Sequence, residues 1–297
     1  MEKRNYLNGY AEKNTSRLVL SCGCNQNCLF CDAGHLGFDD RAELIAEELS
    51  SDSLAGRVSV TGGEPTLDPR LPGLIRKIKK NKLKHVAILT NGLRFASRRY
   101  LDSIKSAGMD EVVLSFFESD ADRYDLLANA PGAFVKKIAA MENLRQSGTK
   151  TKINLLVYSG NQTSAARIVE WLYGKYGIKE FALSVLEPDC ERVQANPWLI
   201  PDIKVVLKSL SRIAVYCGKN GISCMVPANG AIPRCAADTL GVKYPGGIIK
   251  GADIQEKVRI KPAGLCAGCG HMAACAGIIR HYALGLAGFL RKKKRNV

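Results

Sequence analysis

Three cysteines lie close together in the segment CNQNCLFC, where Cys24, Cys28 and Cys31 follow the spacing Cys-x3-Cys-x2-Cys. Three thiolates on one short loop can each bind one iron of a [4Fe–4S] cube and leave the fourth iron open to a small molecule. Zinc is an alternative occupant, because His35 would complete a set of three cysteines and one histidine. The loop by itself therefore predicts a metal or iron–sulfur site with two possible occupants.

A second motif, TGGEP, occupies residues 61–65. Paired glycines such as Gly62 and Gly63 let the backbone approach a ligand closely, and exposed backbone groups can bind a charged small molecule. The motif ends a predicted strand at 57–61, and the cysteine loop follows another predicted strand at 17–21. Because adjacent parallel strands end at the same edge of a sheet, we expect the two motifs to lie together.

The cysteine usage indicates metal chemistry in a reducing compartment. Seven of the eleven cysteines fall into two short segments, one around the loop at 24–31 and one at 266–275. The polar N-terminal sequence has no signal-peptide core, and no run of about 18 apolar residues occurs, so we predict a cytoplasmic protein without a transmembrane segment. Disulfides are rare in the cytosol, so clustered thiols favour metal or iron–sulfur ligation.

The chain is strongly basic, with 43 Lys and Arg against 28 Asp and Glu and a net charge of +15. This excess suits a nucleic acid, an acidic peptide or an anionic small molecule, and it equally suits a solvated surface with the basic tail 291–295. No RNA-binding motif is present and aromatic residues make up only 7% of the chain. We therefore expect only weak, nonspecific binding of nucleic acid.

Short apolar runs alternate with amphipathic stretches from about residue 17 to residue 216. The predicted strands are Arg17–Ser21, Arg57–Thr61, His85–Thr90, Glu111–Phe117, Lys152–Tyr158 and Glu180–Leu186. The predicted helices are Arg41–Leu49, Leu71–Lys80, Ser97–Ala107, Ala133–Gln146, Ser164–Tyr176 and Pro201–Tyr216. This order predicts an α/β fold with a parallel sheet, either doubly wound or a partial barrel. Beyond residue 216 the alternation stops, so we predict domains at 1–216 and 217–297.

The order of a strand, CNQNCLFC, a helix, a strand and TGGEP resembles the radical S-adenosylmethionine (SAM) superfamily, in which an aromatic residue, here Phe30, precedes the last cysteine. The segments LTNG at 89–92 and KINLLVYSGN at 152–161, with Ser115 between them, extend the resemblance over roughly residues 15–216. It implies a partial (β/α)6 TIM-like barrel and replaces zinc by an iron–sulfur cluster in the loop.

The resemblance also implies a role for each matching residue. Cys24, Cys28 and Cys31 would bind the [4Fe–4S] cluster, and SAM would chelate its open iron. Gly62, Gly63 and Glu64 would hold the SAM amino group, and Phe30 would be a further cofactor-binding residue. The remaining candidates are polar groups for the SAM ribose or carboxylate: Asn91, Ser115 and Lys152.

The C-terminal cysteines resemble the auxiliary-cluster extension called SPASM, or its shorter form called Twitch. The expected ligands of one auxiliary [4Fe–4S] cluster are Cys235, Cys266, Cys269 and Cys275, with Cys224 as a substitute. A full SPASM pattern continues with further cysteines, and none follows Cys275, so we expect one auxiliary cluster and not two. A zinc knuckle of the same four residues is the alternative.

The resemblance implies an oxidoreductase that receives one electron from a flavodoxin- or ferredoxin-type reductant and cleaves SAM to a 5′-deoxyadenosyl radical. This radical would take a hydrogen atom from the substrate, first of all a peptide or protein side chain, as in peptide maturases. Small-molecule or cofactor biosynthesis and RNA modification are the alternatives, and an electron carrier with two clusters is the non-enzymatic one. Cys190, which follows the sixth predicted strand, is a candidate for hydrogen-atom delivery or substrate contact.

Overall fold

The computed structural model describes residues 15–20, 23–31, 56–81, 84–227, 230–244, 259–272, 275 and 277–294. The helix expected at 41–49, His35 and the last residue of the first predicted strand, Ser21, lie outside the described residues. The chain divides into two compact units. The first contains Asn14–Asn154 and Leu172–Ile178, and the second contains Leu155–Trp171 and Lys179–Val297. This division falls within the predicted barrel and does not coincide with the boundary expected after residue 216.

One seven-stranded sheet has its strands in chain order, β1 to β7. The strands are β1 (Thr15–Val19), β2 (Arg57–Thr61), β3 (His85–Thr90), β4 (Glu111–Phe116), β5 (Lys150–Val157), β6 (Glu180–Val185) and β7 (Ser223–Met225). The pairs β1–β2, β2–β3, β3–β4 and β6–β7 are parallel. The expected parallel α/β barrel-type sheet is confirmed. The sheet has one strand more than the six predicted. This strand, β7, pairs with β6 and extends the sheet into the segment beyond residue 216 that was expected to form the small domain.

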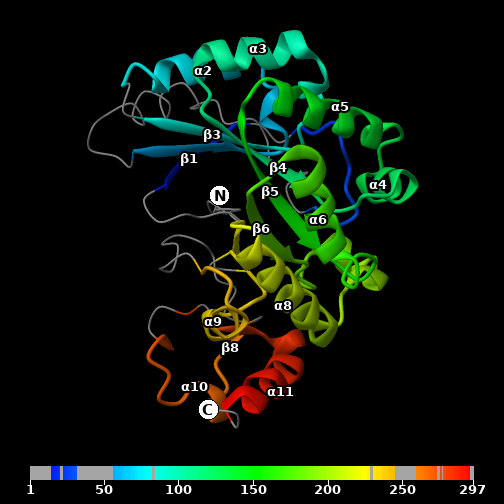
Figure 1. Ribbon diagram of the computed structural model, residues 1–297, viewed down its shortest axis with the longest axis vertical. Coiled ribbons are helices and arrows are strands. Elements are labelled where there is room, and N and C mark those ends of the chain that lie inside the picture. Colours follow the sequence, from blue (N-terminus) through cyan, green and yellow to red (C-terminus); the bar gives the residue numbers. More distant parts are fainter. Residues whose placement is uncertain are drawn as a thin grey trace. The chain divides into compact units, whose positions relative to one another are not determined.

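Four helices of the first unit follow its strands. They are α2 (Leu71–Ile78), α3 (Arg98–Ala107), α4 (Ala121–Ala128) and α5 (Ala133–Gln146). Helices α2 and α3 lie side by side (Figure 1). Helix α3 begins where Ser97 Oγ accepts a hydrogen bond from the backbone N–H of Tyr100, and it ends at Gly108, whose φ of 110° suits glycine. The short helix α4, which was not predicted, begins at the capping carboxylate of Asp120.

The second unit carries β6 and β7 with the helices α7 (Glu191–Gln194), α8 (Ile203–Lys219), α9 (Arg234–Leu240), α10 (Ala263–Cys266) and α11 (Ala283–Lys294). The strands β8 (Arg259–Ile260) and β9 (Ile278–Ile279) form an antiparallel pair. Helix α11 packs on α8 and α9, as Figure 1 shows in red and yellow. A Cβ atom on Gly285 would lie 2.2 Å from Ile203 Cγ2, so the absence of a side chain allows α11 to approach α8 closely. Helix α6 (Ala165–Tyr176) contributes to both units. Among the described helices, none is long and apolar enough to cross a membrane.

Candidate active site

The cysteine loop and the TGGEP turn meet at the carboxyl ends of β1 and β2. The backbone N–H of Glu64 donates a hydrogen bond of 2.8 Å to the carbonyl oxygen of Gly23, one residue before Cys24. The two strands are parallel neighbours, with Val19 opposite Thr61 at their ends. The structure therefore brings the two sequence motifs together at the edge of the sheet where barrel enzymes bind their ligands.

The Glu64 carboxylate connects this turn to the end of β3. Its Oε1 accepts hydrogen bonds from Thr66 N at 3.1 Å, from Thr66 Oγ1 at 2.5 Å and from Thr90 Oγ1 at 2.5 Å. Its Oε2 accepts one from the backbone N–H of Asn91 at 2.7 Å. The residue is fully buried. The carboxylate thus fixes the position of the two turns, which leaves the backbone of Gly62 and Gly63 as the part of the motif that can face a ligand.

Asn91 connects the end of β3 to the cysteine loop. Its side-chain Nδ2 donates to Asn25 Oδ1 at 2.7 Å and to Cys24 Sγ at 3.6 Å. Gly92 follows with a φ of 77°, and a Cβ there would lie 2.2 Å from Leu114 Cδ1, so only glycine fits. The sequence LTNG therefore places an amide donor against the first cysteine of the loop.

Helix α4 holds the middle of the cysteine loop. The backbone N–H groups of Asn27 and Leu29 each donate a 2.9 Å hydrogen bond, to the carbonyl oxygens of Ala128 and Leu127 respectively. These carbonyls belong to the last turn of the helix, where they lack partners within the helix itself. Asn129 ends α4 in the left-handed conformation, with a φ of 44°. The unsatisfied end of a short helix thereby fixes the loop that carries the three thiols.

Aromatic rings support the same loop. The ring of Phe30 meets Phe117 edge-on at a centroid distance of 5.0 Å, and Phe117 stacks on Tyr124 at 4.3 Å. The Tyr124 hydroxyl accepts a hydrogen bond of 3.2 Å from Gln26 Nε2. Phe30 is expected among the cofactor-binding residues. In the structure its ring contacts Phe117 and so supports the cysteine loop.

The three thiols influence each other's ionisation. Burial, and then the negative charges of the Cys31 and Cys24 thiolates, raise the pKa of the Cys28 thiol to about 12. Burial is also the main cause of the raised pKa of Cys24. These two thiols therefore keep their protons at neutral pH until a metal displaces them. Among the described residues, no three His, Cys, Asp or Glu side chains converge on one point as single-ion ligands would. Three thiols on one loop fixed by α4 are a donor set that fits three irons of a [4Fe–4S] cube.

Ser115 and Lys152 are placed differently from each other. Ser115 lies near the carboxyl end of β4, beside β3, which Asn91 follows, and its carbonyl oxygen accepts a hydrogen bond of 2.7 Å from Lys137 Nζ. Lys152 is the third residue of β5, and its ammonium forms an ion pair of 3.3 Å with Glu111 at the amino end of β4. The structure does not bring Lys152 to the cysteine loop, so it is no longer a candidate for the SAM carboxylate.

Lys137 was not predicted to belong to this site. It lies on α5, is fully buried, and its Nζ donates hydrogen bonds to the carbonyl oxygens of Asn91 and Ser115. Its helix neighbours on the buried side are apolar residues such as Ala140 and Met141. The only sequence signal is one lysine at a core position of an otherwise amphipathic helix, a pattern that a lysine with its charged end in solvent would also give.

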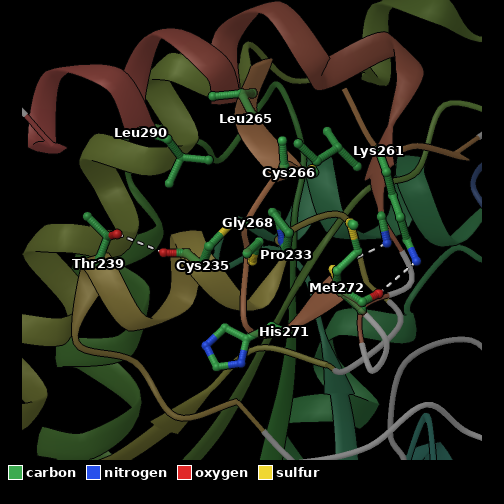
Figure 2. A pocket seen from close by; sticks show the side chains of 15 residues that line it. Pro233, Cys235, Thr239, Lys261, Leu265, Cys266, Gly268, His271, Met272 and Leu290 are labelled. Carbon is green, nitrogen blue, oxygen red and sulfur yellow. Dashed lines mark hydrogen bonds between the residues drawn. The ribbon is translucent and has the colours of Figure 1, made fainter. Parts of the chain in front are cut away.

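The C-terminal cysteines line a cavity of about 810 Å³ in the second unit. All four expected ligands, Cys235, Cys266, Cys269 and Cys275, line this cavity. Burial, followed by the charges of the other three thiolates, raises the pKa of Cys235 to about 11. Figure 2 shows Cys235, Cys266 and His271 around the cavity. The imidazole Nε2 of His271 lies 3.5 Å from Asp238 Oδ2. Four thiols, from α9, α10 and the segment that follows, thus line one cavity.

Cys224 and Cys190 lie elsewhere. The Cys224 thiol in β7 is buried and interacts with the Cys217 thiol at the end of α8, which lowers the pKa of Cys224. Cys224 is not among the described residues that line the cavity, so Cys235 is the better fourth ligand. Cys190 is half-buried and precedes α7 after the end of β6. Its expected role in hydrogen-atom delivery stays a prediction.

Residues 18–172, more than half of the 297-residue chain, match the family model of the Radical SAM superfamily. The chain is 28% identical over 182 residues to the protein named "Probable GTP 3',8-cyclase" of Metallosphaera sedula, and this match covers 58% of the chain and 55% of that protein. The chain therefore spans about half the length of the curated relatives it matches.

Solved structures share the fold at low sequence identity. "Native anSMEcpe with bound AdoMet and Cp18Cys peptide" is 19% identical with a TM-score of 0.56, over 71% of this chain and 63% of that chain. "Crystal structure of Streptococcus suis SuiB bound to precursor peptide SuiA" is 17% identical with a TM-score of 0.57, over 74% of this chain and 49% of that chain.

Proposed function

The chain belongs to the radical SAM superfamily, and we propose that it takes a hydrogen atom from an anionic small molecule of the kind transformed in cofactor biosynthesis. The family implies a [4Fe–4S] cluster, SAM and an external one-electron reductant. When bound, the cluster supplies the electron that cleaves SAM to methionine and a 5′-deoxyadenosyl radical. The observation that carries the proposal is the connection of three motifs, the cysteine loop, the TGGEP turn and LTNG, by Glu64 and Asn91.

The residues of this group divide into ligands and supports. Cys24, Cys28 and Cys31 would hold the cluster. The backbone of Gly62 and Gly63 would face the SAM amino group, and Asn91 and Ser115, at the ends of β3 and β4, would lie near its polar groups. Glu64, Phe30 and the end of α4 keep this loop and its neighbouring turns in place before any ligand binds, which reduces the ordering cost of binding.

The cavity of the second unit supports a second cluster. Four thiols that line one cavity give the ligand number of a cluster fully held by cysteines. The ligands would be Cys235, Cys266, Cys269 and Cys275, and such a cluster would relay an electron or contact substrate. The whole segment 217–297 would then act as the auxiliary-cluster part of the chain.

A small anionic substrate is favoured by the curated relatives and by charge. The M. sedula relative is named for a reaction of GTP, and the match includes more than half of this chain. A net charge of +15 attracts phosphorylated substrates over neutral ones. This proposal ranks cofactor biosynthesis above peptide modification, which was the first expectation from the sequence.

Deuterium transfer tests the substrate class. The reconstituted, reduced protein is incubated anaerobically with SAM and with GTP deuterated throughout its ribose, and the 5′-deoxyadenosine formed is analysed by mass spectrometry. Deuterium in that product supports a nucleotide substrate. SAM cleavage that is neither stimulated by GTP nor accompanied by deuterium transfer, across the common nucleoside triphosphates, would contradict it.

A peptide substrate is the second candidate, favoured by the C-terminal cysteine pattern that resembles SPASM. The measurement that separates the two is the same cleavage assay with a library of deuterated peptides encoded near this gene. Label transfer from a peptide but not from nucleotides would reverse the ranking.

A further inference from the structure

Lys137 is a buried lysine whose amino group contacts backbone carbonyl oxygens and an aromatic ring. Its ammonium donates to the carbonyl oxygens of Asn91 and Ser115 and lies 5.7 Å from the centre of the Tyr124 ring. Among the described carboxylates, none forms an ion pair with it. A buried ammonium without a nearby negative charge tends to lose its proton, so Lys137 stays charged only where a negative charge lies close to it.

The negative charges that act on Lys137 belong to the candidate active site. Burial lowers the pKa of the Lys137 ammonium to about 7, while the charges of Glu64 and of the Cys28 thiolate raise it. The further negative charge of a cluster bound to the loop would raise that pKa again and keep Lys137 protonated. The Cys28 thiol, the middle one of the loop, donates a hydrogen bond of 3.8 Å to Gln26 Oε1.

The environment of Lys137 connects it to the loop by short steps. The Tyr124 ring near its ammonium carries the hydroxyl that accepts from Gln26, two residues before Cys28. Asn91, whose carbonyl oxygen accepts from Lys137, uses its side chain to contact Cys24. Lys137 thus contacts two residues, Asn91 and Tyr124, that themselves contact the cysteine loop. Its side chain is fully buried, so water and screening ions do not reach the ammonium.

On this basis we propose that Lys137 is a positioning residue, whose buried cation stabilises the reduced state of the cluster held by Cys24, Cys28 and Cys31. The inference rests on the proposed function, because it requires that cluster. Thiolate ligands make the cluster site negative, and reduction adds one further negative charge, so a fixed cation nearby favours the reduced form. The hydrogen bonds to Asn91 and Ser115 hold the ammonium in place beneath the two strand ends.

The test is the reduction potential of the first cluster, measured by redox titration with EPR detection in the full chain. The auxiliary cysteines are replaced by Ala (C266A/C269A) in every sample so that one signal remains. The variants are K137M, which removes charge and donors, and K137Q, which removes the charge and keeps an amide donor. We expect the ratio of reduced to oxidised cluster at a given potential to fall about tenfold in both, which for one electron corresponds to about 59 mV.

K152M is the matched control, because Lys152 is also a buried lysine but pairs with Glu111 at the amino end of the strands. Its potential should equal that of the parent. A potential unchanged in K137M or K137Q would overturn the proposal, as would an equal shift in K152M. Failure of both Lys137 variants to fold would assign the lysine to the fold itself and would also overturn it. A parent protein that binds no cluster would instead refute the proposed function.

Discussion

Replacing Glu64 by Gln perturbs the group that joins the TGGEP turn to the end of β3. Gln keeps one oxygen, which can still accept from Thr66 and Thr90, but it turns an NH2 group toward the backbone N–H of Asn91. The variant loses one hydrogen bond to a charged acceptor, worth about 1.5–3 kcal/mol, and leaves a buried donor unsatisfied at a cost of about 1–3 kcal/mol. Together these effects predict that E64Q lowers the free energy of unfolding by about 2.5–6 kcal/mol.

The assay is urea unfolding of the metal-free protein followed by far-UV circular dichroism, with the slope of the transition checked for constancy. D68N is the matched control in the same turn, because the buried carboxylate of Asp68 pairs with Arg70, whose side chain is 33% exposed and can recover its hydration. D68N should lose less than about 1.5 kcal/mol. If E64Q loses no more stability than D68N, the reasoning that Glu64 holds the two turns together is refuted. The cluster-loaded E64Q should also bind SAM more weakly, measured by calorimetry.

Three further predictions concern the charges and cysteines outside this turn. Burial raises the pKa of Glu111, but the hydrogen bond from Arg57 and the charges of Arg57, Lys152 and Lys150 together lower it by more. The pKa of Glu111 therefore lies below its usual value. Its stabilising contribution is present above that value and is lost as the pH falls through the lowered pKa, so E111Q should cost about 3–5 kcal/mol at pH 7 and flatten the acid dependence of the urea midpoint. Iron analysis of C266A/C269A should give about four irons per chain, against about eight in the parent. An unchanged iron content, or bound zinc in place of iron, would contradict the presence of an auxiliary iron–sulfur cluster. K152M should bind SAM within about twofold of the parent in calorimetry, since Lys152 pairs with Glu111; a tenfold loss, about 1.4 kcal/mol, would restore it as a SAM ligand.

The sequence was sufficient for the parts of the site that depend on strand order. The apolar runs around β1, β2, β3 and β4 have the lengths of buried strands, and parallel neighbours necessarily end at the same edge. The cysteine loop, the TGGEP turn and LTNG therefore had to meet, as the hydrogen bonds of Glu64 and Asn91 show.

Details that depend on register and packing were not predictable from the sequence. The segment KIN was expected to start a strand, but β5 begins at Lys150, so Lys152 lies near its amino end and far along the strand from the site edge. Lys137 resembles any lysine of an amphipathic helix until its burial is known. The short apolar run Ile222–Val226 indicates a strand where β7 lies, but its pairing with β6 is decided by tertiary contacts.

The central claim is that the loop at Cys24–Cys31 holds a cluster that cleaves SAM. The most direct measurement is anaerobic turnover of the reconstituted protein with dithionite and SAM, with 5′-deoxyadenosine quantified by liquid chromatography and mass spectrometry. C28A is compared with C190A, a variant of a cysteine outside the cysteine loop and outside the described cavity lining. The account predicts 5′-deoxyadenosine from the parent and from C190A in this substrate-free assay, and none above background from C28A, because two thiolates hold the cluster poorly. Equal cleavage by C28A and the parent would contradict it.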